Sequence, residues 1–198
     1  MPAAAAPSLV GTYRVTEGPD VAGELRIAAN HRFDYALAAG ALDEAAQGRW
    51  EAEGTAVCLY TEPRPVPPKF TLMPHREVAA DAPCLLVTWP DGRGVALIDF
   101  VIGFDHGDPL SGYTQDYGWS LPPDEKRIPR WIDLAAPVME IKPQHFALDA
   151  RTPLPIRALL TPNDIGVVDF LHACLEPAKD GFVLHREGGT MRLARQRR

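Results

Sequence analysis

The stretch that decides the fold reads ELRIAANHRFDYAL, residues 24–37. Apolar and polar residues alternate in it up to Ile27, and they alternate again from Arg32 onward. A period of two places one set of side chains on each face of a strand. Asn30 and His31 lie between the two runs, where turn-forming residues are expected. The stretch therefore predicts a β-hairpin with one apolar face.

Similar short runs, separated by turn residues, follow along the rest of the chain. The 20 Pro and 16 Gly residues interrupt longer helices. Only 42–47 and 162–166 have the composition of a helical turn, and 40–46 is expected to be a connection. We predict an all-β fold, mainly an antiparallel barrel-like unit with an additional β-sandwich-like sheet in the middle third. The predicted strands are 9–16, 24–27, 32–37, 48–51, 56–61, 84–89, 95–104, 113–119, 128–134, 138–142, 144–148, 156–160, 167–175, 181–186 and 190–195.

The positions of prolines and turn residues predict how these strands are grouped into structural units. Prolines at 63, 65, 67 and 68 prevent regular ladder pairing there. The runs 181–186 and 190–195 form the clearest hairpin, and they are expected to complete the barrel. The predicted segments are a flexible N-terminal stub at 1–7, barrel strands at 8–74, an additional or inserted sheet at 83–137, and strands completing the barrel at 138–198.

Charge and hydropathy exclude several classes of protein. Lys and Arg number 20 against 26 Asp and Glu, a net charge of −6, which argues against a nucleic-acid-binding surface. The longest apolar run, 95–104, is too short to span a bilayer as a helix. Residues 1–8 lack the basic and apolar regions of an export signal. Either the chain is cytoplasmic, or the Ala/Pro run follows a removed signal or lipid anchor and the protein is periplasmic or outer-membrane-associated. We favour the second interpretation.

The three cysteines, Cys58, Cys84 and Cys174, show no C-x-x-C spacing. In apolar strands a free cysteine behaves as a small hydrophobic residue, which is the expectation for all three. Export would also allow a disulfide between Cys58 and Cys84. His172 and Cys174 form a soft i, i+2 pair that a transition metal could use, but the sequence identifies no third ligand.

A polar loop carries the strongest candidate for a metal site. Asp105, His106 and Asp108 bring three potential ligands within four residues. A metal-dependent hydrolase using this loop is one alternative for the function. The competing interpretation, which we favour, is a solvated turn, because Asp and Gly favour turns without any metal.

The sequence lacks the usual motifs of catalysis. It contains no G-x-S-x-G elbow and no glycine-rich phosphate loop, and no serine has an evident His and Asp partner. The adjacent carboxylates Asp43 and Glu44 do not face each other as glycosidase carboxylates must. We therefore expect no cofactor and no evident catalytic activity.

Several segments carry a resemblance to bacterial envelope proteins. The chain resembles small lipocalin-like barrels and is similar to the N-terminal domain of the copper-response outer-membrane lipoprotein family. This resemblance covers roughly the first 60 residues and implies an envelope location. That family's C-x-x-C motif is missing, so its metal or redox property is not expected here. The quoted segments are Gly11-Thr12-Tyr13-Arg14, Glu24-Leu25-Arg26-Ile27, Asn30-His31-Arg32-Phe33-Asp34-Tyr35, Gly48-Arg49-Trp50 and Val57-Cys58-Leu59.

Two further patterns extend the resemblance. Residues 40–44 and 161–166 resemble segments of uncharacterised envelope proteins of Gram-negative bacteria. Residues 91–95 and 112–119 look like parts of transthyretin-like or Ig-like sandwich modules of secreted proteins. The second pattern implies a sheet packed beside the barrel or inserted into it.

A binding surface, if there is one, is expected at the barrel mouth. Phe33, Tyr35 and Trp50 would line it, and Arg14 and Arg49 would meet a carboxylate or phosphate. The competing interpretation is that the aromatics fill the core, which we favour. We expect an envelope-associated binding or structural protein whose partner is an envelope protein or a small amphipathic ligand. A lipocalin-like carrier is the alternative.

Overall fold

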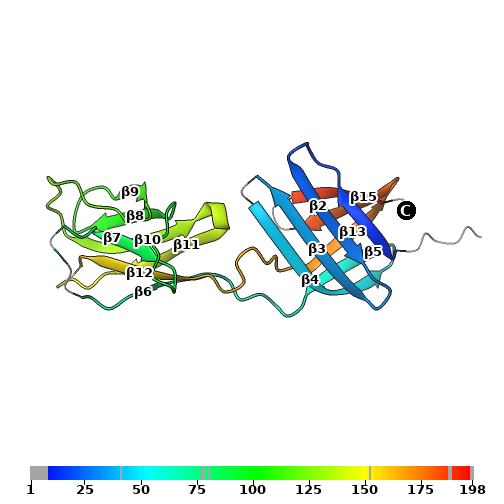
Figure 1. Cartoon of the computed structure of the whole chain (residues 1–198), viewed down its shortest axis with the longest axis horizontal. Helices are drawn as coiled ribbons and strands as arrows, with labels where there is room; N and C mark the ends of the chain where they lie inside the picture. Colours follow the sequence, from blue (N-terminus) through cyan, green and yellow to red (C-terminus); the bar gives the residue numbers. More distant parts are fainter. Residues whose placement is uncertain are drawn as a thin grey trace, which may run out of the picture. The chain divides into compact units, whose positions relative to one another are not determined.

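The computed structural model describes residues 9–40, 42–76, 79, 81–151, 153–186 and 189–196. They form two compact units (Figure 1). The barrel unit contains the chain up to Pro65 and again from Gly166 onward, and the sandwich unit contains Val66–Ile165. The sandwich unit is therefore an insertion between two parts of the barrel.

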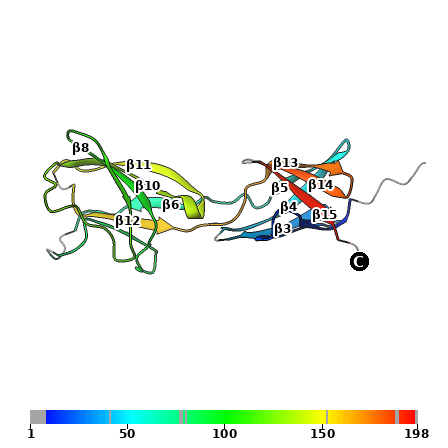
Figure 2. The same cartoon turned by 90° about the horizontal axis from the view of Figure 1, so that it is seen from above.

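The barrel unit is a closed antiparallel barrel of eight strands, as the sequence predicted. Around the wall the order is β1-β15-β14-β13-β5-β4-β3-β2, and much of this wall can be followed in Figure 2. Closure occurs at β1, where Tyr13 is opposite both Leu25 of β2 and Arg195 of β15. The strands are β1 Gly11–Val15, β2 Val21–Ile27, β3 Arg32–Ala39, β4 Leu42–Glu53, β5 Ala56–Thr61, β13 Leu171–Ala178, β14 Gly181–Arg186 and β15 Gly189–Arg195.

The period-two pattern of the opening hairpin places its apolar residues inside the barrel. Phe33, Tyr35 and Leu37 alternate with exposed residues along β3. They belong to one hydrophobic core inside the barrel, and each of the other seven barrel strands also contributes residues to it. Phe170, which lies just before β13, also belongs to this core and contacts the ring of Tyr35 at a centroid distance of 5.1 Å. The returning chain is thus anchored in the barrel.

The expected connection at 40–46 and helical turn at 42–47 were wrong. Residues 42–47 belong to the long strand β4, where Ala45 is opposite Ala36 of β3. Glu44 and Ala46 point inward, so the ladder with β3 overrides the local helix preference of the segment. Residues 163–166 form a turn. In the part of the chain that the structure describes, the one helix is the 3₁₀ turn η1, Pro137–Met139, and none is long and apolar enough to cross a membrane.

The sandwich unit has two sheets that share one hydrophobic core. One has the order β11-β10-β8-β9 and the other the order β6-β12-β7. Phe100, Ile102 and Ile132 of the first sheet pack in one cluster with Phe70, Val87 and Leu160 of the second. The strands are β6 Lys69–Leu72, β7 Leu85–Thr88, β8 Asp99–Phe104, β9 Leu110–Tyr113, β10 Pro129–Ala136, β11 Ile141–Ala147 and β12 Ile156–Thr161.

The observed boundaries of this insertion differ from the predicted ones. The prediction assigned residues 69–72 to the barrel segment 8–74 and residues 141–161 to the barrel segment 138–198. In the structure β6 and β7 pair with β12, and β11 pairs with β10, so these residues belong to the inserted unit. The additional sheet predicted at 83–137 is therefore only part of the inserted unit. Alternation identifies a strand, whereas its partner is decided by long-range packing that the local pattern does not contain.

Several predicted strands also have different bounds. The strands predicted at 138–142 and 144–148 are one strand, β11, which follows the 3₁₀ turn η1. Strand β8 begins at Asp99 rather than at residue 95, because Leu97 has a φ of 60° and leaves the extended conformation. The segment predicted as 113–119 is a strand only up to Tyr113. It then turns at Asp116 and Tyr117, and Gly118, whose φ is 94°, closes the turn by pairing with Gln115. Glycine tolerates this left-handed conformation without steric cost.

A disulfide joins two neighbouring strands of the barrel. Cys58 of β5 is opposite Cys174 of β13 and bonded to it, although the two are 116 positions apart in the sequence. The expectation that all three cysteines are free was wrong for Cys58 and Cys174. The disulfide between Cys58 and Cys84 that export would allow does not form either, since Cys84 is free and lies in the inserted unit. The insertion explains the error, because the strand beside β5 is distant along the chain.

Candidate functional site

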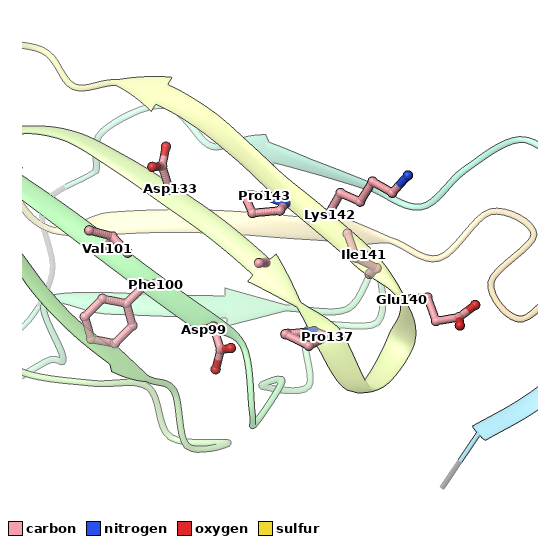
Figure 3. Close-up of a pocket in the computed structure, with 10 residues that line it drawn as sticks. Asp99, Phe100, Val101, Asp133, Pro137, Glu140, Ile141, Lys142 and Pro143 are labelled. Atoms are coloured by element: carbon pink, nitrogen blue, oxygen red, sulfur yellow. The ribbon is translucent and has the colours of Figure 1, made fainter. Parts of the chain in front are cut away.

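The best-defined apolar depression lies on the outer face of the sandwich unit's larger sheet. Its volume is about 580 Å³, and Figure 3 shows the residues around it. Strands β8 and β10 form one side, and η1 with the start of β11 forms the other. The lining residues are Asp99, Phe100, Val101, Asp133, Ala135, Pro137, Glu140, Ile141, Lys142 and Pro143. We call this depression the sheet pocket.

The backbone explains why the sheet is hollow at this point. The register between β10 and β11 shifts between Leu134 and Ala136, which marks an irregularity in the ladder. Such bulges bend a strand and increase its twist. Ala135 adds only a methyl group to the outer face beside the bend. Pro143 is tolerated because β11 is an edge strand of this sheet.

The register of the sheet places apolar and acidic side chains side by side. Val101 is opposite Asp133, and Asp99 is opposite Ala135. Carboxylates of Asp99, Asp133 and Glu140 are spaced around the apolar lining (Figure 3). Asp133 also holds the ring of His145, with 2.6 Å between Oδ1 and Nδ1.

An aromatic side chain continues the same face next to Asp133. Trp131 lies two residues before Asp133 on β10, and its ring contacts His145 at a centroid distance of 5.4 Å. The indole covers Gly103, where an added Cβ would come within 1.9 Å of the ring. Glycine is therefore required for this placement of Trp131. The sheet pocket thus combines an apolar lining, which favours a hydrocarbon group, with three carboxylates, the ammonium of Lys142 and a nearby indole. The excess of carboxylates and the indole favour a cationic group on the ligand.

The aromatic residues predicted to line a binding surface are buried in the barrel core. Phe33, Tyr35 and Trp50 are 1%, 3% and 7% exposed. The Trp50 indole donates a hydrogen bond to the carbonyl of Ala28 at 2.9 Å and stacks on His31. These contacts agree with the core-filling interpretation.

The two predicted arginines lie apart from these aromatics. Arg49 is on the outer face of β4, where its guanidinium pairs with Glu62 at 2.8 Å and lies 4.1 Å from the ring centroid of Tyr60. Arg14 lines a second depression of about 700 Å³ against β2 and β3. Three carboxylates, of Glu24, Asp43 and Glu44, also line that depression. The predicted residues therefore do not form one site.

The guanidinium of Arg127 holds the predicted metal loop in place. Arg127 donates hydrogen bonds from Nη1 to the carbonyls of His106 at 3.4 Å and Asp108 at 2.7 Å. The Asp105 carboxylate accepts from the backbone N–H of Ile128 and contacts the imidazole of His106. Among the described residues the three side chains do not converge as a metal-ligand group. The geometry favours the solvated turn and does not support the hydrolase alternative.

Arg127, which contacts this loop, also provides a pH-dependent prediction through its partner Glu125. Side-chain and backbone hydrogen bonds from Arg127 lower the pKa of Glu125 from 4.5 to about 2. Because the folded-state pKa is depressed, the pair stabilises the fold fully above pH 4.5 and loses this contribution as the pH falls towards 2. We expect a carboxyl ¹³C titration of Glu125 to have its midpoint near 2. In Arg127→Ala the midpoint should return towards 4.5. A midpoint near 4.5 in the unmodified protein would contradict the proposed pairing.

The sheet pocket was not found by sequence reasoning. The alternation of Trp131, Asp133 and Ala135 could have indicated an outer strand face, but not its neighbours. Comparison of the chain with family models, curated proteins and solved structures gave no match. The function is therefore argued from the site itself.

Proposed function

We propose that the chain is a binding protein of the cell envelope and that the sheet pocket binds a small amphipathic ligand with a cationic group. The observation that carries this proposal is the apolar depression surrounded by the carboxylates of Asp99, Asp133 and Glu140. The barrel unit, with its filled core, acts as the scaffold that carries the inserted sandwich.

The disulfide supports the envelope as the compartment. Disulfides form and persist mainly in oxidising compartments such as the periplasm and the cell exterior. The Cys58–Cys174 bond fits such a location. It adds to the expectation from the envelope-like sequence segments and is independent of it.

The class of ligand follows from the pocket's chemistry. Val101, Ile141 and the two prolines offer apolar surface to a hydrocarbon chain or ring. Three carboxylates against the single ammonium of Lys142 leave the lining net acidic, so an ammonium or guanidinium group is favoured over an anion. A volume of about 580 Å³ suits one small molecule or one long side chain of a partner.

A pair of amphiphiles that differ in charge sign tests the proposal. Below their micelle concentrations, dodecylammonium should bind the full chain and dodecyl sulfate should bind at least about tenfold more weakly, as measured by isothermal titration calorimetry. Val101→Arg, which fills the pocket with a cation, should abolish the binding of dodecylammonium. Equal binding of the two amphiphiles, or unchanged binding of dodecylammonium by Val101→Arg, would contradict the proposal.

Removal of charge gives a graded version of the same test. The double variant Asp99→Asn, Glu140→Gln keeps the shape of the pocket and should weaken dodecylammonium binding about three- to tenfold, because exposed charge pairs contribute little each. The double variant Asp116→Asn, Asp124→Asn removes two exposed carboxylates elsewhere in the sandwich unit, so it is the control matched in charge and should bind normally. Equal loss in both variants would show that net charge, rather than the pocket, determines binding.

A further inference from the structure

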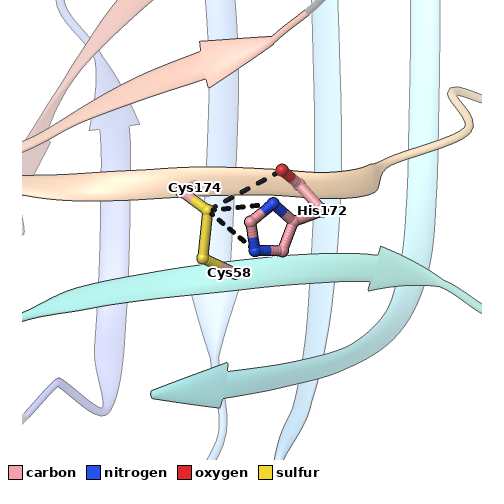
Figure 4. A group of neighbouring side chains, drawn as sticks. All are labelled: Cys58, His172 and Cys174. Carbon is pink, nitrogen blue, oxygen red and sulfur yellow. Dashed lines mark hydrogen bonds between the residues drawn. A yellow bond between two sulfur atoms is a disulfide. The ribbon is translucent and has the colours of Figure 1, made fainter. Parts of the chain in front are cut away.

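A second cluster of reactive side chains lies on the outer face of the barrel. Cys58 of β5 and His172 and Cys174 of β13 place their ligand atoms within 4.8 Å of one another (Figure 4). It is the one such group among the described residues. In the structure the two sulfurs are bonded to each other. The sequence had supplied only the pair of His172 and Cys174.

An irregular backbone places the histidine in this cluster. Leu171 is opposite Tyr60 and Ala173 is opposite Leu59, so His172 is an extra residue in β13. Its φ of 65° is a left-handed value that few non-glycine residues adopt. Bulges of this kind re-aim a side chain and often occur beside functional sites. Here the bulge brings the His172 ring nitrogens within 3.8 and 3.9 Å of the Cys174 sulfur.

A carboxylate also holds the imidazole in place. Both oxygens of Glu53 lie 3.1 Å from Nε2 of His172. When Nε2 carries the proton and donates a hydrogen bond to Glu53, Nδ1, which lies 3.9 Å from the Cys174 sulfur, keeps its lone pair free for a metal ion. Metal-bound histidines almost always have such a second partner, which fixes the tautomer and the orientation of the ring.

We propose that reduction of the Cys58–Cys174 disulfide converts this cluster into a Zn²⁺ site with three protein ligands. A dithiol supplies two electrons and two protons, its own sulfurs join as a disulfide, and the bond between Cys58 and Cys174 breaks to give two thiols. Binding of Zn²⁺ by the two sulfurs and His172 then releases both thiol protons. This inference goes beyond the proposed ligand site and does not depend on it.

The sheet keeps the two thiols in a suitable position after reduction. Cys58 and Cys174 are opposite each other with their Cα atoms 4.0 Å apart. The strands also pair on both sides of them, Leu59 with Ala173 and Val57 with Leu175. Tetrahedral Zn²⁺ with bonds of about 2.3 Å needs sulfurs roughly 3.8 Å apart. The side chain of His172 is 53% exposed, so water can occupy the fourth position.

The test uses the full chain in a Cys84→Ser background, which leaves only the two cluster thiols. The protein is reduced with a phosphine, desalted without oxygen, and titrated with Zn²⁺ against a chromophoric chelator. We expect one equivalent to bind with release of two protons, and Co²⁺ to give a thiolate charge-transfer band. The oxidised protein should bind at least tenfold more weakly. Equal binding by the two forms would overturn the proposal.

A histidine variant tests the third ligand. His172→Asn should weaken Zn²⁺ binding at least tenfold, because asparagine tolerates the left-handed backbone but replaces the imidazole. His145→Asn, an exposed histidine that also pairs with a carboxylate, is the matched control and should bind as the background does. Equal affinity of His172→Asn and the background would overturn the assignment of His172.

Circular dichroism covers the case in which reduction unfolds the barrel. One equivalent of Zn²⁺ should then restore the β-sheet signal, because metal binding and folding are coupled. Failure of Zn²⁺ to restore that signal or to bind would count against the site.

Discussion

Replacing Cys174 with Ala should lower the free energy of unfolding of the barrel by about 3 to 5 kcal/mol. The disulfide closes a loop of 116 residues, and cross-linking distant residues restricts the unfolded chain most strongly. The sandwich unit lies inside this loop and has its own core. If it stays folded while the barrel unfolds, it shortens the flexible part of the loop, which places the effect at the lower end of the range.

Urea unfolding under oxidising conditions measures this effect. Two transitions are expected, and only the barrel transition should move to lower urea in Cys174→Ala. Cys84→Ala is the control, since Cys84 is free and lies in the sandwich unit. A barrel transition that does not move would show that the cross-link contributes nothing to stability.

Trp50→Ala should destabilise the barrel by about 3 to 5 kcal/mol, because it removes a large buried side chain and leaves a cavity. Trp50 is 7% exposed, its indole donates to the carbonyl of Ala28, and its ring stacks on His31. If the residue instead lined a loosely packed binding cavity, the same substitution would cost little stability.

Chemical denaturation followed by circular dichroism distinguishes these outcomes, since the chain keeps three other tryptophans that complicate fluorescence. Trp50→Phe retains an aromatic ring and should lose clearly less stability than Trp50→Ala. An unmoved midpoint in Trp50→Ala would contradict the core assignment and make the barrel interior the leading candidate for a ligand site.

The antiparallel barrel was predictable where the local pattern and the tertiary environment agree. In β3 the apolar residues alternate, and they fill the barrel. In β4 the local pattern and the tertiary environment conflict. The segment 42–47 has helix-forming residues, and only pairing with β3 makes it a strand. Such long-range pairing also explains why the predicted insertion was too short.

The candidate sites were less predictable than the fold. The sheet pocket depends on a register shift between β10 and β11, and on Val101 lying opposite Asp133. The disulfide depends on two strands becoming neighbours across a whole inserted unit. Neither arrangement has a sequence motif. The Asp105 loop had a suggestive composition, yet the guanidinium of Arg127 already holds it.

The most direct test of the proposed function is to locate the bound ligand. A ¹H–¹⁵N spectrum of the full chain should be followed as dodecylammonium is added below its micelle concentration. We expect saturable shifts concentrated at 99–101, 133–135 and 140–142, with the barrel signals unchanged. Shifts concentrated along β2 and β3 beside Arg14, or shifts scattered over both units without saturation, would contradict it.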